Sequence, residues 1–440
     1  MVPNMDFAPR GWSSSLVYGR LSCPPGLFVQ GLETLPPELL VMIMSDYCSI
    51  NDIQSFISAS PVGLSCFKAN KHLVLGPRCR MINTQLGELL PMALFDIRLR
   101  HLREKHDHLG AKAVEWLIKH LMEELSVRMS TQPPRGMWPA IDDGSFVWRD
   151  SLPKLAHLER LVSETDAIMT GYATKRWENM QEEPTRHVGR VVVRGFPVHV
   201  FTHLEPEPLK LSATEYTRLL ETLICLDIYC NAFFYDGKVL FYGDWAFRKL
   251  ICWSRTNPNK DLGAEQMMTN FYTMLNFILD RFSALLKPTC RSMRNQSGWH
   301  TMPRTEGLRR FMTRSMRDHM AFIRYLGSKG YSVLLQMEDL SGQTQRECVV
   351  ETFLHFTSLS NPPIWLEEPF DFDDIYFDPT SQWMPWLESD WYEDIHSGLW
   401  EIETGFWDEE RLDGIRERVK SWASRQIQNR QPWFPPMRWD

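Results

Sequence analysis

The chain has 440 residues, of which 43% are hydrophobic and 23% charged, and its formal net charge is −7. This composition is typical of a folded protein with a well-filled core, and the length is enough for two to four domains. The acidic balance, without a basic run of domain size, argues against nucleic acid as the main partner.

The N-terminal stretch 1–31 is rich in Pro, Gly and Ser and predicts a loose arm without the apolar segment of a secretory signal. The nine cysteines are scattered and form no C-x-x-C pair, which indicates a reduced chain in the cytoplasm and/or the nucleus. The longest apolar run, Leu219–Tyr235, is interrupted by Glu221 and Asp227, so we expect no membrane span and no membrane partner.

The next stretch, 32–76, predicts three short helices. Pro36 and Pro37 suit the first turn of a helix, where a missing N–H costs least, and Glu38 suits the helix dipole. Leu35 precedes this turn and could pack back onto the helix. Helical spacing places five apolar side chains near one face, which are Leu39, Leu40, Ile43, Met44 and Tyr47.

Ser49 and Asp52 indicate the start of the second helix. The pair Ser60-Pro61 ends it, because a residue before proline avoids the α region, and the same pair can begin the third helix. The buried sides of these two helices would carry Ile50, Ile53 and Ile57, followed by Leu64 and Phe67.

This arrangement resembles the F-box, the module that docks on the Skp-type adaptor of cullin–RING ubiquitin ligases, and is most similar to divergent F-box proteins of filamentous fungi. The residues that carry the resemblance are Leu35-Pro36-Pro37-Glu38-Leu39-Leu40, Ile43, Asp52-Ile53, Ala59-Ser60-Pro61 and Phe67. It covers roughly a tenth of the chain strongly. Beyond it, Leu211–Phe234 is loosely similar to the same fungal proteins.

The resemblance implies a substrate-receptor subunit of a ubiquitin ligase, which is not itself an enzyme. Its partners would be the Skp-type adaptor, the cullin scaffold and a client protein held by the rest of the chain. The residues implied to bind the adaptor are Leu35, Pro36, Leu39, Leu40, Ile43 and Ile53.

The remaining stretch, 77–440, predicts an irregular helical body with possible internal boundaries near 131–150 and 181–210. Within the second boundary, Val191–Val193 and Val198–Phe201 predict at most one small β-hairpin. Strands are too few for α/β alternation, so the predicted class is all-α with long loops, of which Asn361–Trp400 is the longest. Helical periodicity is found at Leu86–Leu125 with a polar joint at His101–Gly110, at Ser151–Met180, at Tyr216–Phe234 behind a Ser212/Glu215 capping box, and at Asp244–Trp253, Gly263–Leu286, Glu306–Leu326, Gln345–Phe356 and Asp408–Ile427.

Three groups of side chains could carry chemistry, and each has a plainer structural interpretation. His101, His106 and His108 form the best metal-ligand cluster, but no Cys or carboxylate accompanies them at zinc-site spacing, so a solvated helix face or loop is favoured. Cys225 and Cys230 lie in an apolar helix and are interpreted as small hydrophobic residues. The acidic group Asp371, Asp373, Asp374 and Asp378 lacks the central glycine of a calcium loop and predicts a solvated loop.

The sequence contains no phosphate-binding loop, glycine-rich dinucleotide motif, H-E-x-x-H or G-x-S-x-G. We therefore expect no catalytic residue, no metal and no cofactor. Two alternatives stay open: a stand-alone helical interaction scaffold whose F-box has degenerated into core, and a metal-dependent enzyme in which carboxylates and histidines meet in one pocket. The exposure of Leu39, Leu40 and Ile43 separates the first alternative from adaptor docking, because periodicity alone does not show what covers an apolar face.

Overall fold

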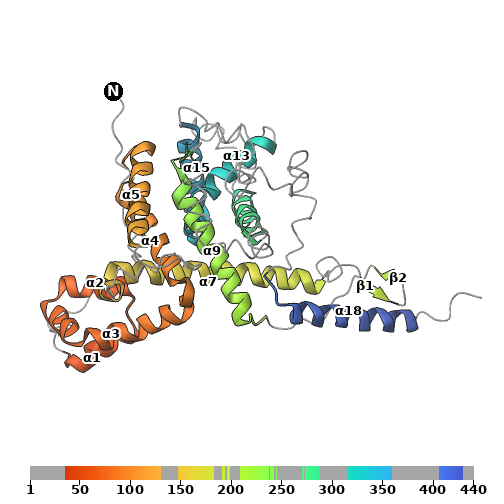
Figure 1. The fold of residues 1–440 in the computed structure, drawn as a ribbon, viewed down its shortest axis with the longest axis horizontal. Coiled ribbons are helices and arrows are strands. Elements are labelled where there is room, and N and C mark those ends of the chain that lie inside the picture. Colours follow the sequence, from red (N-terminus) through yellow and green to blue (C-terminus); the bar gives the residue numbers. More distant parts are fainter. Residues whose placement is uncertain are drawn as a thin grey trace, which may run out of the picture. The chain divides into compact units, whose positions relative to one another are not determined.

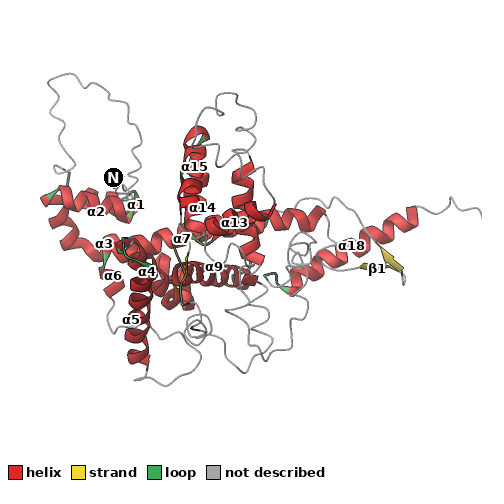
Figure 2. Cartoon of the chain, turned by 90° about the horizontal axis from the view of Figure 1, so that it is seen from above, coloured by secondary structure: helices red, strands yellow, loops and turns green. Residues whose placement is uncertain are grey.

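The computed structural model describes the chain in segments, and helices dominate them (Figures 1 and 2). This confirms the predicted all-α class. The chain divides into two compact units, residues 1–77 and 78–440, which we call the N-terminal module and the helical body. The described segments are 35–106, 108–129, 147–182, 191–193, 196–198, 209–236, 238–241, 244, 270–271, 273–287, 316–358 and 406–429.

The N-terminal module contains α1 (Pro37–Asp46), α2 (Ile50–Ala59) and the first part of α3 (Pro61–Leu86), as the sequence predicts. Ser49 and Asp52 form a complete capping box at the start of α2. The hydroxyl oxygen of Ser60 accepts the N–H of Gly63 at 3.0 Å and so caps α3. Local side-chain to backbone bonds therefore fix both helix starts.

The three helices are packed tightly enough to form a small core of their own. A Cβ placed on Gly63 would lie 2.6 Å from the ring of Phe56, so only glycine allows α2 and α3 to approach this closely. The thiol of Cys66 lies 3.5 Å from the carbonyl oxygen of Pro37 and links α3 to α1. The core side chains are Leu40, Met44, Ile50, Ile53, Cys66, Phe67, Val74 and Leu75.

Replacing Ser49 by alanine should destabilise the N-terminal module by about 1 kcal/mol, because the Asp52 N–H at the start of α2 would lose its acceptor. Amide hydrogen exchange of α2 measures this loss in the full chain. Ser58→Ala on the same helix is the matched control, since the Ser58 hydroxyl only donates to the Gln54 carbonyl within the helix. Equal exchange in the two variants would contradict the prediction.

The helical body begins within α3, and a single 3-10 turn, η2 (Gly87–Leu89), follows the end of that helix. The body is built around helices that cross one another (Figure 1). Figure 1 shows α9 crossing α7, and α4 packs against both. The predicted polar joint at 101–110 is shorter than expected, because α4 continues to Lys105. The helices are α4 (Leu90–Lys105), α5 (Ala111–Met129), α6 (Val147–Asp150), α7 (Leu152–Glu182), α9 (Ala213–Phe233), residues 270–271 and 273–287, α13 (Met316–Gly327), α14 (Tyr331–Asp339), α15 (Gly342–Ser358) and α18 (Glu409–Asn429).

Two small antiparallel ladders accompany the helices. β1 (Val191–Val193) pairs with β2 (Phe196–Val198), so the predicted hairpin forms, but its second strand begins two residues earlier than expected. Pro197 is tolerated because a two-stranded ladder has only edge strands. A second ladder, β3 (Phe234–Tyr235) with β4 (Lys238–Val239), follows α9 and is too short for any sequence alternation to predict.

Several predictions fall on parts of the chain outside the described residues. These are most of Asp244–Trp253, the first parts of Gly263–Leu286 and Glu306–Leu326, the loop Asn361–Trp400 and its acidic group. Of the two cysteines interpreted as small hydrophobic residues of α9, Cys230 is buried without a disulfide, and burial raises the pKa of its thiol. Cys225 is half-buried, and its sulfur lies 3.9 Å from that of Met92. None of the described helices combines the length and the apolarity that crossing a bilayer requires.

Candidate functional site

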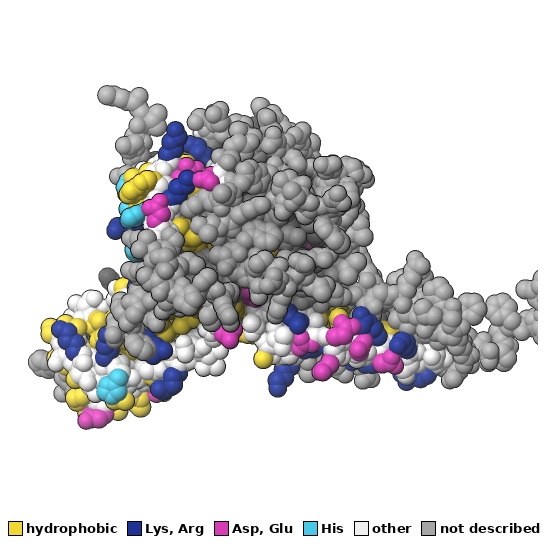
Figure 3. Space-filling view, viewed as in Figure 1, with side chains coloured by type: hydrophobic (Ala, Val, Ile, Leu, Met, Phe, Trp, Pro, Cys, Tyr) yellow, Lys and Arg dark blue, Asp and Glu magenta, His cyan; other side chains and the backbone are white. Residues whose placement is uncertain are grey.

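The first candidate site is an exposed apolar surface on α1 of the N-terminal module. Leu39 and Met42 are exposed, Ile43 is half-buried beside them, and Tyr47, at the end of the helix, is 78% exposed. Leu39 is three residues from Met42 and four from Ile43, so these side chains are neighbours on one helix face. We call Leu39, Met42, Ile43 and Tyr47 the α1 surface; Figure 3 shows hydrophobic and basic side chains side by side on this module.

The single apolar face predicted for this helix is in fact divided in two. Leu40 is 1% exposed and Met44 fully covered, whereas Leu39 is 41% exposed. Two adjacent leucines are about 100° apart on a helix, so they cannot both point into the same core. The inner half of the face closes the module, and the outer half forms the α1 surface together with Met42, which lies beside it.

The six residues implied to bind an adaptor follow the same division. Pro36 and Leu39 are exposed and Leu35 and Ile43 are half-buried, so these four are accessible from solvent. Leu40 and Ile53 are buried in the module's own core and act there as packing residues. Met42 is a further accessible apolar residue, and it lies off the helix face that the sequence predicts.

A second candidate is a cluster of charged side chains inside the helical body. The guanidinium of Arg100 on α4 lies 2.5 Å from Asp227 on α9 and 2.6 Å from Glu164 on α7. Asp96, one turn earlier on α4, lies 3.5 Å from the same guanidinium. Burial, followed by repulsion from Asp227, raises the pKa of Asp96 well above its usual range.

This charged cluster has the perturbed acid typical of functional sites, but it lies out of reach of a substrate. The side chains of Asp96 and Asp227 are 0% and 2% exposed. The Arg100 guanidinium faces the ring of Tyr331 on α14 at 5.7 Å, so four helices meet around it. We interpret the cluster as the polar centre that fixes α4, α7, α9 and α14 together.

The third candidate is a pocket of about 520 Å3 in the helical body, within the size range of small-molecule sites. Its walls come from α4, α5, α6 and the beginning of α7. The apolar part of the lining comprises Leu94, Ile97, Leu102, Leu117, Leu121 and Trp148. The polar part comprises Arg98, His101, Lys105, His106, Lys154 and His157.

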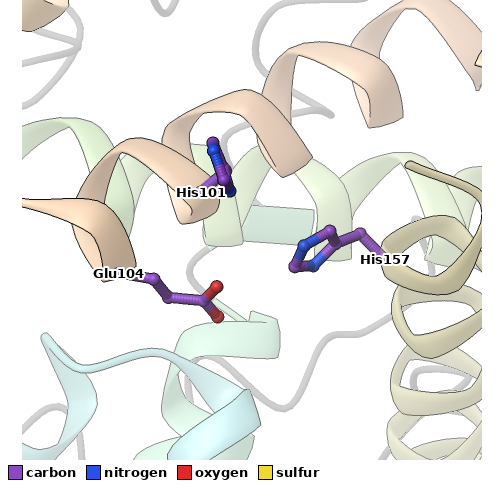
Figure 4. A group of neighbouring side chains, drawn as sticks. All are labelled: His101, Glu104 and His157. Carbon is purple, nitrogen blue, oxygen red and sulfur yellow. The ribbon is translucent and has the colours of Figure 1, made fainter. Parts of the chain in front are cut away.

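At the edge of this pocket, His101 and Glu104 of α4 meet His157 of α7 (Figure 4). One ligand atom of each lies within 4.8 Å of the other two, and the two imidazole rings are 6.1 Å apart. Burial lowers the pKa of His157; the carboxylate of Glu104 acts in the opposite direction, and His101, Arg160 and Arg100 lower the pKa further. The neutral imidazole therefore provides one N–H donor and one acceptor nitrogen to whatever occupies this edge.

The sequence favours a solvated helix face or loop for His101, His106 and His108, and in the structure His101 and His108 are exposed while His106 is half-buried. His101 lies beside His157 rather than with His106 and His108, whose rings contact each other 6.2 Å apart. His157 is isolated in the sequence, and only the packing of α4 on α7 brings it to His101. Two histidines and a carboxylate are ligands suited to a transition metal, although the basic side chains that line the pocket oppose a cation.

Comparisons of the chain with protein-family models, with curated proteins and with solved structures find no match, so the interpretation of these three sites rests on the residues of this chain.

Proposed function

We propose that the chain is a substrate receptor of a cullin–RING ubiquitin ligase, in which the N-terminal module docks a Skp-type adaptor and the helical body holds a client. Its contribution would be proximity rather than side-chain chemistry. A receptor that fixes a client beside the conjugating enzyme raises the client's effective concentration there.

The observation that supports this proposal is the α1 surface. The module already has its own core, so Leu39, Met42 and Ile43 are not needed to close it. Apolar side chains left at the surface in a contiguous group are typical of a protein-binding site. Burying each of them against a partner would contribute about 1.5–3 kcal/mol.

Replacing Leu39 and Ile43 together by aspartate should abolish co-purification with a Skp-type adaptor. Two carboxylates would then have to be desolvated in an apolar interface, which costs several kcal/mol. Pull-down of the co-expressed adaptor by the full-length chain measures the effect. The far-UV circular dichroism of the variant should match the wild type, because neither side chain is fully buried.

The control is Met81→Asp together with Trp116→Asp, an equal change at two exposed apolar side chains of the helical body. This variant should retain the adaptor. If the wild-type chain captures no adaptor, or if both double variants lose it equally, docking through the α1 surface is wrong.

A second candidate function is a stand-alone helical interaction scaffold. The burial of Leu40 and Ile53 favours it, because two of the six residues implied to bind an adaptor are already covered by the module itself. Under this alternative the wild-type chain captures no adaptor, and aspartate at Leu39 and Ile43 alters only the solubility of the chain.

A further inference from the structure

The pocket in the helical body has two chemically different parts. Its floor is apolar: Leu94 and Ile97 are buried, and Leu117, Leu121 and Trp148 complete it. Its edge is basic, with Lys105 at the end of α4 and Lys154 at the beginning of α7. A ligand that fills the pocket must therefore combine an apolar body with a polar end.

The charge of this edge selects the sign of that polar end. Among the described residues that line the pocket there is no Asp or Glu, and neither Lys105 nor Lys154 has an ion-pair partner. The carboxylate of Glu104 lies at the edge, within 4.8 Å of His101 and His157, so three basic lining residues, Arg98, Lys105 and Lys154, stand against one acidic neighbour. Two ammonium groups beside an apolar pocket attract an anion and repel a cation, most effectively where the surroundings limit screening by water. His101 and His157 add ring nitrogens that can donate hydrogen bonds to an oxygen anion at the same edge.

We propose that this pocket binds a small amphipathic anion, a carboxylate with an aliphatic or aromatic body. The body lies on Leu94, Ile97, Leu117 and Leu121, and the carboxylate lies between Lys105 and Lys154. The volume of about 520 Å3 is sufficient for a ligand of this class. The site belongs to the helical body, so it is independent of adaptor docking by the N-terminal module.

A divalent metal held by His101, Glu104 and His157 is the competing occupant. It has three suitable ligand atoms from two helices in its favour. The positive charges of Arg98, Lys105 and Lys154, which line the same pocket, oppose the binding of a cation. Among the three metal-ligand candidates, only Glu104 carries a negative charge. The two occupants also need Glu104 in opposite ways: a metal loses a ligand without it, whereas an anion loses a repelling charge.

Isothermal titration of the full-length chain with decanoate tests the proposal, with decanol and decyltrimethylammonium as the neutral and cationic counterparts. Decanoate should bind saturably at one site, and decanol about tenfold more weakly, because a charge-assisted contact contributes about 1.5–3 kcal/mol. Lys105→Gln with Lys154→Gln should weaken decanoate about tenfold and leave decanol unchanged. Lys112→Gln with Lys287→Gln is the control, since it removes the same charge from two exposed side chains outside the pocket.

Glu104→Gln separates the two occupants. Under the anion proposal this variant binds decanoate as tightly as the wild type or more tightly. A Zn2+ titration whose heat disappears in Glu104→Gln and which competes with decanoate would assign the edge to a metal and overturn the proposal. Equal affinity for decanoate, decanol and decyltrimethylammonium, or no saturable binding of decanoate, would overturn it as well.

Discussion

Replacing Arg100 by methionine should lower the free energy of unfolding by about 3–5 kcal/mol, the cost of removing one partner from a buried ionic cluster. The guanidinium lies 2.5 Å from Asp227 and 2.6 Å from Glu164, and methionine would fill the space without balancing either carboxylate. Denaturant unfolding followed by far-UV circular dichroism measures the loss. Arg80→Met, a change at an exposed arginine, is the control and should alter stability by less than about 0.5 kcal/mol.

The pH dependence of this loss identifies its cause. Burial acts to raise the pKa of Glu164, but Arg100 and Arg160 outweigh it and hold the pKa below its usual range. The stabilisation from Glu164 is therefore present above its unfolded pKa and is lost as the pH falls through its folded pKa. Without Arg100, the buried carboxylates can take up protons instead of remaining charged.

The difference between Arg100→Met and the wild type should consequently narrow as the pH is lowered from 7 towards 4. Asp96 opposes this trend in the wild type, because its raised pKa makes the folded state gain stability as the pH falls through that value. The narrowing therefore depends on Glu164, whose stabilisation of the wild type is lost in acid. A difference that stays constant with pH would mean that lost packing, not charge, explains the effect of the substitution.

Short-range signals explain what the sequence predicts correctly. The capping boxes at Ser49 and Ser212 are three-residue patterns, and both are present at the starts of α2 and α9. The all-α class is predicted from a short-range signal in the same way, because the apolar residues of a helix recur about once per turn. Neither signal depends on the arrangement of distant segments.

Contacts between distant helices explain what the sequence does not predict. Asp227 is recognisable in the sequence only as a charge that interrupts an apolar run, and its partner Arg100 lies on another helix. His157 meets His101 only because α7 packs against α4. A charge in an apolar stripe indicates that a partner exists, but it carries no information about which residue that partner is.

The division of the α1 face has a related cause. Helical spacing groups Leu39 with Leu40 and Ile43, and the packing of α2 and α3 then decides which of them is covered. Leu40 is covered and Leu39 is not. The sequence therefore predicts that an apolar surface exists on this helix, while the exposed half that a partner could contact is defined only by the three-dimensional packing of the module.

Replacing Glu215 by glutamine should weaken the attachment of α18 to the helical body. The buried carboxylate of Glu215 accepts both nitrogens of the Arg411 fork, Nε at 2.6 Å and Nη2 at 2.7 Å. It also accepts the N–H of Ser212 at 2.9 Å and that of Asp408 at 3.1 Å. One side chain therefore joins the start of α9 to the start of α18, and its neutral amide would leave Arg411 without a counter-charge.

The apolar contacts around this carboxylate explain why the effect should stay local. Leu412, Ile415 and Val419 of α18 pack on Trp177 of α7, and the Arg411 guanidinium faces that indole ring at 5.2 Å. The apolar contacts remain in Glu215→Gln, so α18 should keep its helix but open more often. We expect the free energy of opening of α18, as reported by amide hydrogen exchange, to fall by about 2–3 kcal/mol. This is less than the cost of leaving a fully buried charge unpaired, because Arg411 is partly exposed to water.

Hydrogen exchange of α18 peptides, compared with α15 peptides of the same protein as a reference, measures this opening. The pH dependence of the exchange shows whether charge is responsible. Burial acts to raise the pKa of Glu215, but the hydrogen bonds from Arg411, Ser212 and Asp408 lower it overall. Wild-type protection of α18 should therefore be complete above the usual glutamate pKa and fall in acid, whereas Glu215→Gln should lack that fall. Glu417→Gln, at an exposed carboxylate of the same helix bonded to Lys420, should match the wild type. If Glu417→Gln opened α18 as much as Glu215→Gln, the net charge of the helix rather than the buried contact would hold it in place.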